Sequence, residues 1–396
     1  MPKLNIALIG AGRRGAESHL PVISKLKDTY NLVAICDIDE KSAIQHAEKY
    51  RVNAYTSVRD LVEKEQLDVV DITVPGVAHH AVTCFVANAG ISVICETPIA
   101  VSLPMADLMI ETANKNNVKL EIAENYYRAP KERFLSEVIN AGIIGDVSRI
   151  YRIFYEGGYH GMSMLRLRTN GNPKSILGIS QVSPIIPIID RMKRYHTSDK
   201  WSFGFLEFDN NSTAIMIYSN VIHARSLGRG QNGISQIDGS QGTIVGEEIH
   251  IVHQENIETG ATSTGYLPQR VMVDINGVQV IDKIKLELPN QQVQWDNPFK
   301  NYQLSEGQIA VADELLSIAN AIIQDTDPEY GAIPARQDQE MNIGMNESAQ
   351  RNRETIPFPI IDPTETETKI HENYEREYGH PIDDVEAGID TFFPRR

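Results

Sequence analysis

Near the start of the chain, the apolar run Leu4-Asn5-Ile6-Ala7-Leu8-Ile9 leads directly into Gly10-Ala11-Gly12-Arg13-Arg14-Gly15. A second apolar run, Leu32 to Cys36, stops at Asp37. In a strand–turn–helix unit of this kind the first glycine makes a tight turn, the second lets the backbone approach a pyrophosphate, and the third lets helix and strand pack closely. The stretch therefore predicts a nucleotide-binding turn whose free N–H groups face phosphates. A structural turn without a ligand is the alternative.

Asp37 and two arginines bear on which nucleotide is bound. Asp37 lies 22 residues after Gly15, where a carboxylate accepts hydrogen bonds from the adenosine ribose and repels a 2′-phosphate, which favours NAD. Arg13 and Arg14 keep NADP open, because a guanidinium there can reach a 2′-phosphate. In the alternative, one arginine pairs with Asp37 or a neighbour and the other is solvated.

The composition indicates a globular protein of two domains. The chain has 396 residues, 41% of them hydrophobic, and this length exceeds one ordinary core. Its net charge of −16 repels a phosphate backbone, so we expect no nucleic-acid partner. We expect no membrane partner either, because no apolar run approaches spanning length and the N-terminus lacks a signal-peptide pattern. The three cysteines, an odd number, favour reduced thiols and a cytoplasmic location.

Strand-like and helix-like patterns alternate through the first third of the chain. Leu67 to Val74 reads as a buried strand, His80 to Asn88 as a helix, and Ile91 to Cys95 as the next strand. This alternation predicts an α/β fold with a doubly wound parallel sheet, a Rossmann domain that we expect over residues 1–124.

After residue 124 the pattern changes to period two, as in Ser148 to Tyr155 and Thr213 to Tyr218. We expect an α+β domain with a largely antiparallel open sheet over residues 125–350, which binds substrate and forms a homodimer or homotetramer through its exposed face. Residues 351–396 are rich in Glu, Asp, Thr and Pro. They form either a disordered acidic tail or an arm over a neighbouring subunit, and Phe392 and Phe393 favour the arm.

The order of these motifs resembles the glucose–fructose oxidoreductase, inositol dehydrogenase and rhizopine-catabolism (Gfo/Idh/MocA) family. The matching residues are Gly10, Gly12, Gly15, Asp37, Pro75 to His79, Glu96 to Pro98, Asn125 to Arg128 and the turn Ile237 to Thr243. The resemblance implies a Rossmann domain, a second sheet domain and a nicotinamide in the cleft between them. It also implies hydride transfer to or from a carbohydrate-like substrate.

The expected cofactor contacts follow the carboxyl ends of strands, where doubly wound folds bind their ligands. They are Gly10, Gly12, Arg13, Arg14, Gly15, Asp37, Pro75, His79, Glu96, Thr97 and Asn125. Several have a structural alternative: His79 can cap its helix, and Glu96 can fix the turn at Pro98. By the same resemblance Arg128 lies at the cleft and binds substrate, and for both Asn125 and Arg128 the alternative is ordinary interdomain hydrogen bonding.

Two positions depart from the family pattern. Thr97 stands where the family has a lysine that contacts cofactor and substrate hydroxyl, and a threonine hydroxyl can orient a substrate but hardly take its proton. The resemblance also aligns Pro173 to Ile189 with a helix that carries a histidine and an aspartate for proton transfer in the family. This stretch contains neither residue.

His160 is the leading candidate for the missing proton carrier. It lies in Gly157-Gly158-Tyr159-His160-Gly161, which we expect to be a loop after the first strand of the second domain, and a histidine can titrate near neutrality. An exposed loop histidine is the alternative. Tyr127 and Lys174 are further catalytic candidates, and Arg166 can grip an acidic group of the substrate, although a solvated arginine is the simpler interpretation.

The sequence thus predicts an NAD- or NADP-dependent oxidoreductase acting on a CH–OH group of a sugar, cyclitol or sugar acid. One alternative uses the cofactor transiently, so that oxidation beside a glycosidic bond permits elimination and the hydride then returns. Another is a catalytically silent NAD-binding sensor or regulatory protein, suggested by the missing proton-transfer residues. No metal site is expected, because the histidines and cysteines lack ligand spacing.

Overall fold

The computed structural model describes residues 3–154, 157–190, 194–221, 233–252 and 263–394, which pack into two compact units. The first unit holds the residues up to 129, residues 299–339 and those from 367 onward. The second holds residues 130–298 and 340–366. The division at residues 124 and 350 stays a prediction about domains, while in packing the residues from 367 onward join the N-terminal part of the chain.

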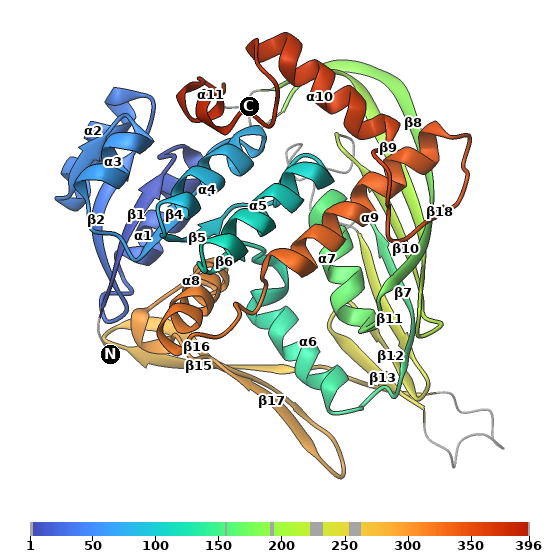
Figure 1. The fold of residues 1–396 in the computed structure, drawn as a ribbon. Coiled ribbons are helices and arrows are strands. Elements are labelled where there is room, and N and C mark those ends of the chain that lie inside the picture. Colours follow the sequence, from blue (N-terminus) through green and yellow to red (C-terminus); the bar gives the residue numbers. More distant parts are fainter. Residues whose placement is uncertain (1–2, 155–156, 191–193, 222–232, 253–262, 395–396) are drawn as a thin grey trace. The chain divides into compact units, whose positions relative to one another are not determined.

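The first unit is built on a six-stranded parallel sheet in the order β3-β2-β1-β4-β5-β6 (Figure 1). Its strands are β1 (Leu4–Ile9), β2 (Tyr30–Cys36), β3 (Asn53–Tyr55), β4 (Val69–Ile72), β5 (Ser92–Cys95) and β6 (Leu120–Ile122). The strand order reverses at β1, and right-handed crossovers then place helices on both faces. Every residue of β4 and β5 is buried, as in central strands covered on both sides. The predicted doubly wound sheet is confirmed.

Helices connect these strands, and local side chains fix where several of them begin. They are η1 (Gly15–His19), α1 (Leu20–Ile23), α2 (Glu40–Tyr50), α3 (Val58–Lys64), η2 (Gly76–Ala78), α4 (His79–Asn88), α5 (Leu103–Lys115) and η3 (Tyr126–Arg128). The Asp39 carboxylate accepts the first free N–H groups of α2, and the Ser57 hydroxyl does so for α3. The element η1 is a π-helix, a rare form that is frequent at functional sites.

Segments late in the chain complete the first unit. Helix α8 (Glu306–Gln324) begins at a capping box formed by Ser305 and Gln308, and it packs on β5, β6 and α1. Helix α9 (Ala332–Gln350) begins in the first unit and ends in the second. Helix α10 (Glu365–Tyr378) leads to α11 (Val385–Asp390), which packs against α4 (Figure 1). The segment for which the sequence left open a disordered tail or an arm therefore contains two helices.

The second unit contains a nine-stranded sheet in the order β14-β13-β12-β11-β7-β10-β9-β8-β18 and a three-stranded sheet, β15-β16-β17. All neighbouring strands are antiparallel except β7 and β10, so the predicted α+β architecture is confirmed. The helices are α6 (Pro130–Asn140) and α7 (Gly158–Thr169). The strands are β7 (Val147–Ile153), β8 (Pro173–Ile189), β9 (Tyr195–Phe208), β10 (Thr213–Ser219), β11 (Ile234–Gly239), β12 (Gly242–Val245), β13 (Glu248–Ile251), β14 (Thr264–Tyr266), β15 (Gln269–Ile275), β16 (Val278–Glu287), β17 (Gln292–Asp296) and β18 (Ile356–Pro357).

Two local expectations in the second unit are wrong. The stretch aligned with a helix is strand β8, because Pro184 and Pro187 within it cannot occupy a helix interior, and its register with β9 shifts between Pro184 and Ile188. His160 lies in the first turn of α7 and not in a loop, since Gly157 is the extended residue that precedes this helix. Tyr155, at the end of the predicted first strand, lies outside the described residues.

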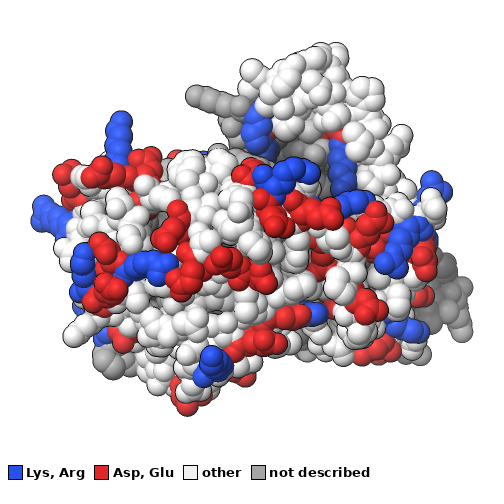
Figure 2. Space-filling view, turned by 45° about the horizontal axis from the view of Figure 1, so that its top comes forward, with Lys and Arg blue, Asp and Glu red and all other residues white. Residues whose placement is uncertain are grey.

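Acidic and basic side chains are interspersed on the face drawn in Figure 2, and acidic ones prevail there, in line with the net charge of −16. The absence of a nucleic-acid partner stays a prediction. Among the described residues no helix is both long and apolar enough to cross a membrane.

Candidate cofactor-binding site

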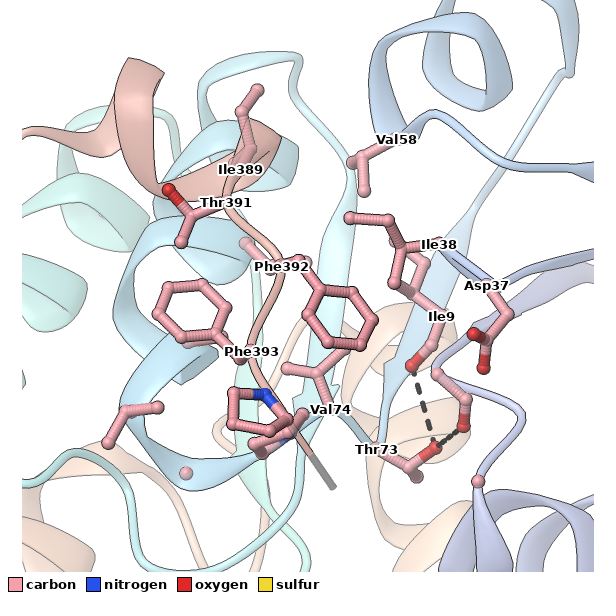
Figure 3. A pocket seen from close by; sticks show the side chains of 18 of the residues that line it. Ile9, Asp37, Ile38, Val58, Thr73, Val74, Ile389, Thr391, Phe392 and Phe393 are labelled. Atoms are coloured by element: carbon pink, nitrogen blue, oxygen red, sulfur yellow. Dashed lines mark hydrogen bonds between the residues drawn. The ribbon is translucent and has the colours of Figure 1, made fainter. Parts of the chain in front are cut away.

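The turn after β1 requires glycine at two positions. Gly10 has a φ of +98°, and a Cβ there would lie 2.8 Å from the backbone of Thr73. A Cβ on Gly15 would lie 2.4 Å from the Gly10 carbonyl oxygen. Thr73 Oγ1, just after β4, donates to that same carbonyl at 2.5 Å (Figure 3). The start of the helix is thereby held close to the sheet, with bare backbone at the position where the fingerprint binds phosphate.

A cavity of about 650 Å³ lies along this turn. Six predicted cofactor contacts line it, namely Gly10, Gly12, Arg13, Arg14, Asp37 and Pro75. Other walls come from Ile38 and Val58, from residues 73–78 after β4, and from the C-terminal segment (Figure 3). The volume falls within the range of cofactor sites, about 300–1,000 Å³.

The lining residues fit a nicotinamide adenine dinucleotide. Asp37 directly follows β2, is 4% exposed and accepts the backbone N–H of Asp39 at 2.9 Å. Its carboxylate borders the cavity beside Ile38 (Figure 3). The cavity thus combines a carboxylate for a ribose, bare backbone for a pyrophosphate and apolar side chains for a base. Arg13 is exposed at the same cavity, so the NADP alternative keeps a guanidinium.

Arg14, which also lines the cavity, pairs with Glu96, the residue that follows β5. The Arg14 Nε and the His19 Nε2 both contact Glu96 Oε1, the latter at 2.8 Å. The other ring nitrogen of His19 lies 2.8 Å from Asp71 Oδ2 in β4. The second Glu96 oxygen accepts the backbone N–H of Thr97 at 3.0 Å. We call Arg14, His19, Asp71, Glu96 and the nearby Glu314 the buried charge network.

Burial and opposite charges set the protonation states in the buried charge network. Burial alone would lower the pKa of His19, but Asp71 and Glu96 raise it to about 10, so the ring is cationic at neutral pH. Burial acts to raise the pKa of Glu96, yet His19 and Arg14 lower it overall. Glu314 Oε1 is 3.8 Å from His19 Nε2, and burial raises the pKa of Glu314 to about 8. Two cations thus face an ionised Glu96 and a Glu314 that is mostly neutral at pH 7.

The loops after β4 and β5 are joined by His79. Its Nδ1 lies 2.8 Å from the Pro98 carbonyl oxygen and its Nε2 lies 3.0 Å from that of Val74. The ring is buried, which lowers its pKa, and a neutral imidazole donates to only one of these carbonyls. His79 therefore ties together two loops at the carboxyl edge of the sheet. Its contact with the cofactor stays a prediction.

Thr97 is half-buried and is the next residue in the chain after Glu96, a member of the buried charge network. Its Oγ1 lies 3.5 Å from Glu96 Oε2, and the Thr97–Pro98 peptide is cis. Glu96 therefore does what the structural alternative expected of it, since it accepts the N–H of the turn residue. Its predicted cofactor contact, and that of Thr97, are not tested by this geometry.

Arg128 is fully buried within the first unit. Its guanidinium contacts Glu121 at 2.6 Å, Asp313 at 2.8 Å and Glu329 at 3.0 Å. Burial raises the pKa of Glu121 to about 7, although Arg128 acts to lower it. The ring of Tyr127 lies 4.9 Å from the Arg128 guanidinium carbon, and the Asn125 carbonyl accepts the Arg128 N–H at 3.2 Å. These contacts give Arg128 a structural role, and substrate or catalytic roles for Asn125, Tyr127 and Arg128 stay predictions.

The remaining candidates lie in the second unit. His160 and Arg166 are on α7, where the His160 carbonyl accepts the Ser163 hydroxyl at 2.9 Å and its ring packs edge-on against Tyr159. Lys174 is the second residue of β8. Whether these three residues meet Thr97 in one site stays a prediction.

The sequence interpretation missed His19, Asp71, Glu314 and the C-terminal lining of the cavity. Each of the three charged residues interrupts an apolar pattern: His19 precedes Leu20, Asp71 falls inside the buried run of β4, and Glu314 adjoins Leu315 on α8. Ionisable residues on buried faces are almost always paired. An ionisable residue within an apolar pattern was therefore the sequence signal for a buried charge pair. Among the described residues no group of histidines, cysteines and carboxylates is arranged to hold a metal ion.

Comparison with known proteins gives a family match for the first part of the chain. Residues 4–124 match the model of an oxidoreductase family with an NAD-binding Rossmann fold (GFO_IDH_MocA). The chain is 29% identical over 140 residues to D-apiose dehydrogenase of Paraburkholderia graminis, covering 35% of this chain and 37% of that protein. It is 29% identical over 157 residues to inositol 2-dehydrogenase of Salmonella typhimurium, covering 38% and 46%. It is 29% identical over 149 residues to 2,7-anhydro-N-acetylneuraminate hydratase of Mediterraneibacter gnavus, covering 37% and 38%.

These matches span less than half the length of each curated relative. The likeness to a solved structure extends over more of the chain. The oxidoreductase from Agrobacterium radiobacter, determined in complex with NAD+, L-tartaric acid and magnesium, aligns with a TM-score of 0.64 over 90% of this chain and 98% of that one. At 19% identity this likeness shows the fold of both parts of the chain.

Proposed function

On the match of residues 4–124 to the NAD-binding Rossmann-fold oxidoreductases, we propose that the chain is an NAD-dependent oxidoreductase of the Gfo/Idh/MocA family. When bound, the nicotinamide supplies a hydride acceptor or donor at its C4 carbon. The substrate is a sugar, cyclitol or sugar acid that reacts at a carbinol carbon. The relatives named D-apiose dehydrogenase and inositol 2-dehydrogenase support this class.

The observation that carries the proposal is the cavity at the glycine turn. It brings the fingerprint glycines and Asp37 to one space of about 650 Å³. A structural βα turn has no need of this combination, because neither a buried ribose-binding carboxylate nor an open apolar cavity contributes to the packing of the turn. NADP is the less favoured cofactor, since Asp37 repels a 2′-phosphate.

The buried charge network supports the substrate end of the proposal. Because Arg14 and His19 hold Glu96, and Glu96 holds the Thr97 backbone, the Thr97 hydroxyl is presented in a fixed position at the edge of the sheet. We assign it the role of orienting the substrate hydroxyl. A threonine hydroxyl is a poor acid or base near neutrality, so another group must carry the proton. We assign that step to His160, with Tyr127 and Lys174 as the other candidates and Arg166 as a substrate contact.

The test follows the near-ultraviolet absorbance of reduced nicotinamide after the protein and NAD+ are mixed with a panel of sugars, cyclitols and sugar acids. We expect absorbance to rise with one substrate class and to rise more slowly when NADP+ replaces NAD+. If NAD+ binds but the absorbance stays flat across the whole panel, net dehydrogenation is contradicted.

A second candidate uses the cofactor without net oxidation. One relative is named a hydratase, and hydration changes no net oxidation state. In this case the hydride passes to the cofactor and returns to the same substrate, as in glycoside cleavage by transient oxidation. Product formation without accumulated NADH separates it from the first candidate. NAD+ binding with no product at all would instead identify a sensor, which the threonine at position 97 favours.

The second unit has a surface suited to self-association. Val182, Ile186, Ile189 and Tyr195 are exposed apolar residues of the β8–β9 hairpin, and Ile186 is 82% exposed. Exposed apolar surface can mark an interaction site. We assign them to a homodimer or homotetramer formed through the sheet, and Ile186→Asp should lower the mass measured by sedimentation.

The three cysteines bear on location. They are buried and free of disulfides, which supports a cytoplasmic location.

A further inference from the structure

The C-terminal segment contributes a wall of the cofactor cavity. Residues Tyr378, Gly388, Ile389, Thr391, Phe392, Phe393 and Pro394 line it together with Asp37 and the turn after β1. Figure 3 shows this segment running past the cavity, with the Phe392 ring on the side of Ile38 and the Phe393 ring on the opposite side. All these residues belong to the first compact unit.

Several contacts hold the segment in place on the first unit. Glu367 Oε1 accepts the N–H of Leu103 at 2.7 Å, and His80 Nε2 lies 2.5 Å from the Ile382 carbonyl oxygen. Arg59 contacts Glu386 at 2.6 Å. A Cβ on Gly388 would lie 2.7 Å from Ala81 Cβ, so α11 approaches α4 closely at this glycine. The segment is therefore a fixed part of this unit and not a loose tail.

Phe392 and Phe393 have opposite environments. Phe393 is 7% exposed and packs into an aromatic cluster, with ring centroids 4.8 Å from Tyr378 and 6.0 Å from Tyr374. Phe392 is 63% exposed, although it lines an apolar cavity. Exposure of a phenyl ring to water is unfavourable. The buried Phe393 fixes the backbone here and so holds the neighbouring Phe392 ring in its exposed position. The open ring face is thus available to a ligand.

The position of Phe392 identifies the part of the ligand that it meets. Asp37 marks the adenosine ribose and the glycine turn marks the pyrophosphate, so the adenine lies beyond Asp37, near Ile38 and Val58. The Phe392 ring is on the same side of the cavity (Figure 3). We infer that Phe392 stacks on the adenine of the cofactor and that the C-terminal segment thereby forms the adenine site. This inference rests on the proposed binding of NAD.

The test measures binding of three probes to the full chain by titration calorimetry: NAD+, ADP-ribose and nicotinamide mononucleotide. Stacking of a base on an aromatic ring is worth about 1–3 kcal/mol, so Phe392→Ala should weaken the binding of NAD+ and ADP-ribose by about 5- to 150-fold. Nicotinamide mononucleotide lacks adenine, and its affinity should stay unchanged. Phe392→Trp should bind NAD+ and ADP-ribose at least as well as the wild type. Ile361→Ala removes another exposed apolar side chain and serves as the control.

Each other outcome has a distinct meaning. Equal affinity of wild type and Phe392→Ala for ADP-ribose would overturn the inference while leaving NAD binding intact. Tighter binding by Phe392→Ala would also overturn it, because the ring would then occupy the place of the adenine. Failure of the wild type to bind NAD+ would contradict the proposed function itself, and the inference with it. Since Phe392 is mostly exposed, the melting temperature should be the same for all variants, which separates lost binding from lost folding.

Discussion

Replacement of Glu314 by glutamine tests the buried charge network through the pH dependence of stability. Glu314 lies on α8, is fully buried, and neither oxygen has a hydrogen-bond partner among the described residues. Burial raises its pKa from 4.5 to about 8. Because the native state binds this proton more tightly than the unfolded chain does, its contribution to stability is complete below pH 4.5 and is lost as the pH rises through 8.

The magnitude follows from the size of the pKa shift. Each pKa unit corresponds to about 1.4 kcal/mol, so the free energy of unfolding of the wild type should fall relative to Glu314→Gln by about that amount per pH unit. Across pH 5 to 8 the total is roughly 4 kcal/mol. The glutamine keeps the shape of the side chain and does not titrate, so the difference between the two proteins isolates this one proton.

The assay is urea unfolding of both proteins at pH 5, 6, 7 and 8. Glu111→Gln makes the same chemical change on the exposed side of α5 and serves as the matched control. A difference between wild type and Glu314→Gln that stays constant over this pH range would refute the assignment of a protonated Glu314 in the buried charge network.

Four further predictions concern the site and its support. Asp37→Ser should raise the affinity for NADP+ relative to NAD+ by about tenfold in a binding titration, because it removes a like charge from the 2′-phosphate; an unchanged ratio would contradict this. Gly15→Ala should lower the stability by about 1–3 kcal/mol and weaken NAD+ binding, since its Cβ would lie 2.4 Å from the Gly10 oxygen, and normal melting would contradict the close packing. Arg128→Met should cost about 3–5 kcal/mol in urea unfolding, because Glu121 loses its buried partner, whereas a neutral result would show that Glu121 adapts. His160→Ala should reduce kcat by about 10²- to 10⁴-fold while NAD+ binding is retained, and full turnover would exclude it as the proton carrier.

The first unit was predictable because its signals are local. An apolar run, three glycines at fixed spacing and an aspartate at the end of the next run lie within the first 37 residues, and each has its own steric or electrostatic reason. The structure shows the steric reason directly, because a Cβ on Gly10 or Gly15 would lie too close to neighbouring backbone atoms. Alternation of strands and helices then gave the parallel sheet.

The buried charge network was not predictable in the same way. Its members come from η1 and the residue before it, from β4, from the loop after β5 and from α8, and Glu314 lies far along the chain from the others. A sequence pattern can mark each as an ionisable residue in an apolar context, but only the fold pairs them. Thr97 drew attention as a departure from the family, while the residues that hold its backbone did not.

The packing of the C-terminal segment was not predictable for a different reason. Its acidic composition left a disordered tail and an arm both open, because few apolar residues are consecutive. Tyr374 and Tyr378 are four residues apart on α10, so they share one helix face, and together with Phe393 they form an aromatic cluster. The helical spacing of two tyrosines was the signal that this stretch packs against something. The strand β8 was missed because the resemblance suggested a helix there, although its prolines argued against one.

The most direct measurement of the central claim uses substrates deuterated at their carbinol carbons. The protein is incubated with unlabelled NAD+ and each labelled sugar, cyclitol or sugar acid. The mass of the recovered cofactor is then measured by mass spectrometry. Hydride transfer predicts that one deuterium appears on the nicotinamide ring with one class of substrate and that the label is lost from the substrate carbon. Conversion of a substrate with an unlabelled cofactor, or no label with any member of the panel, would contradict the account.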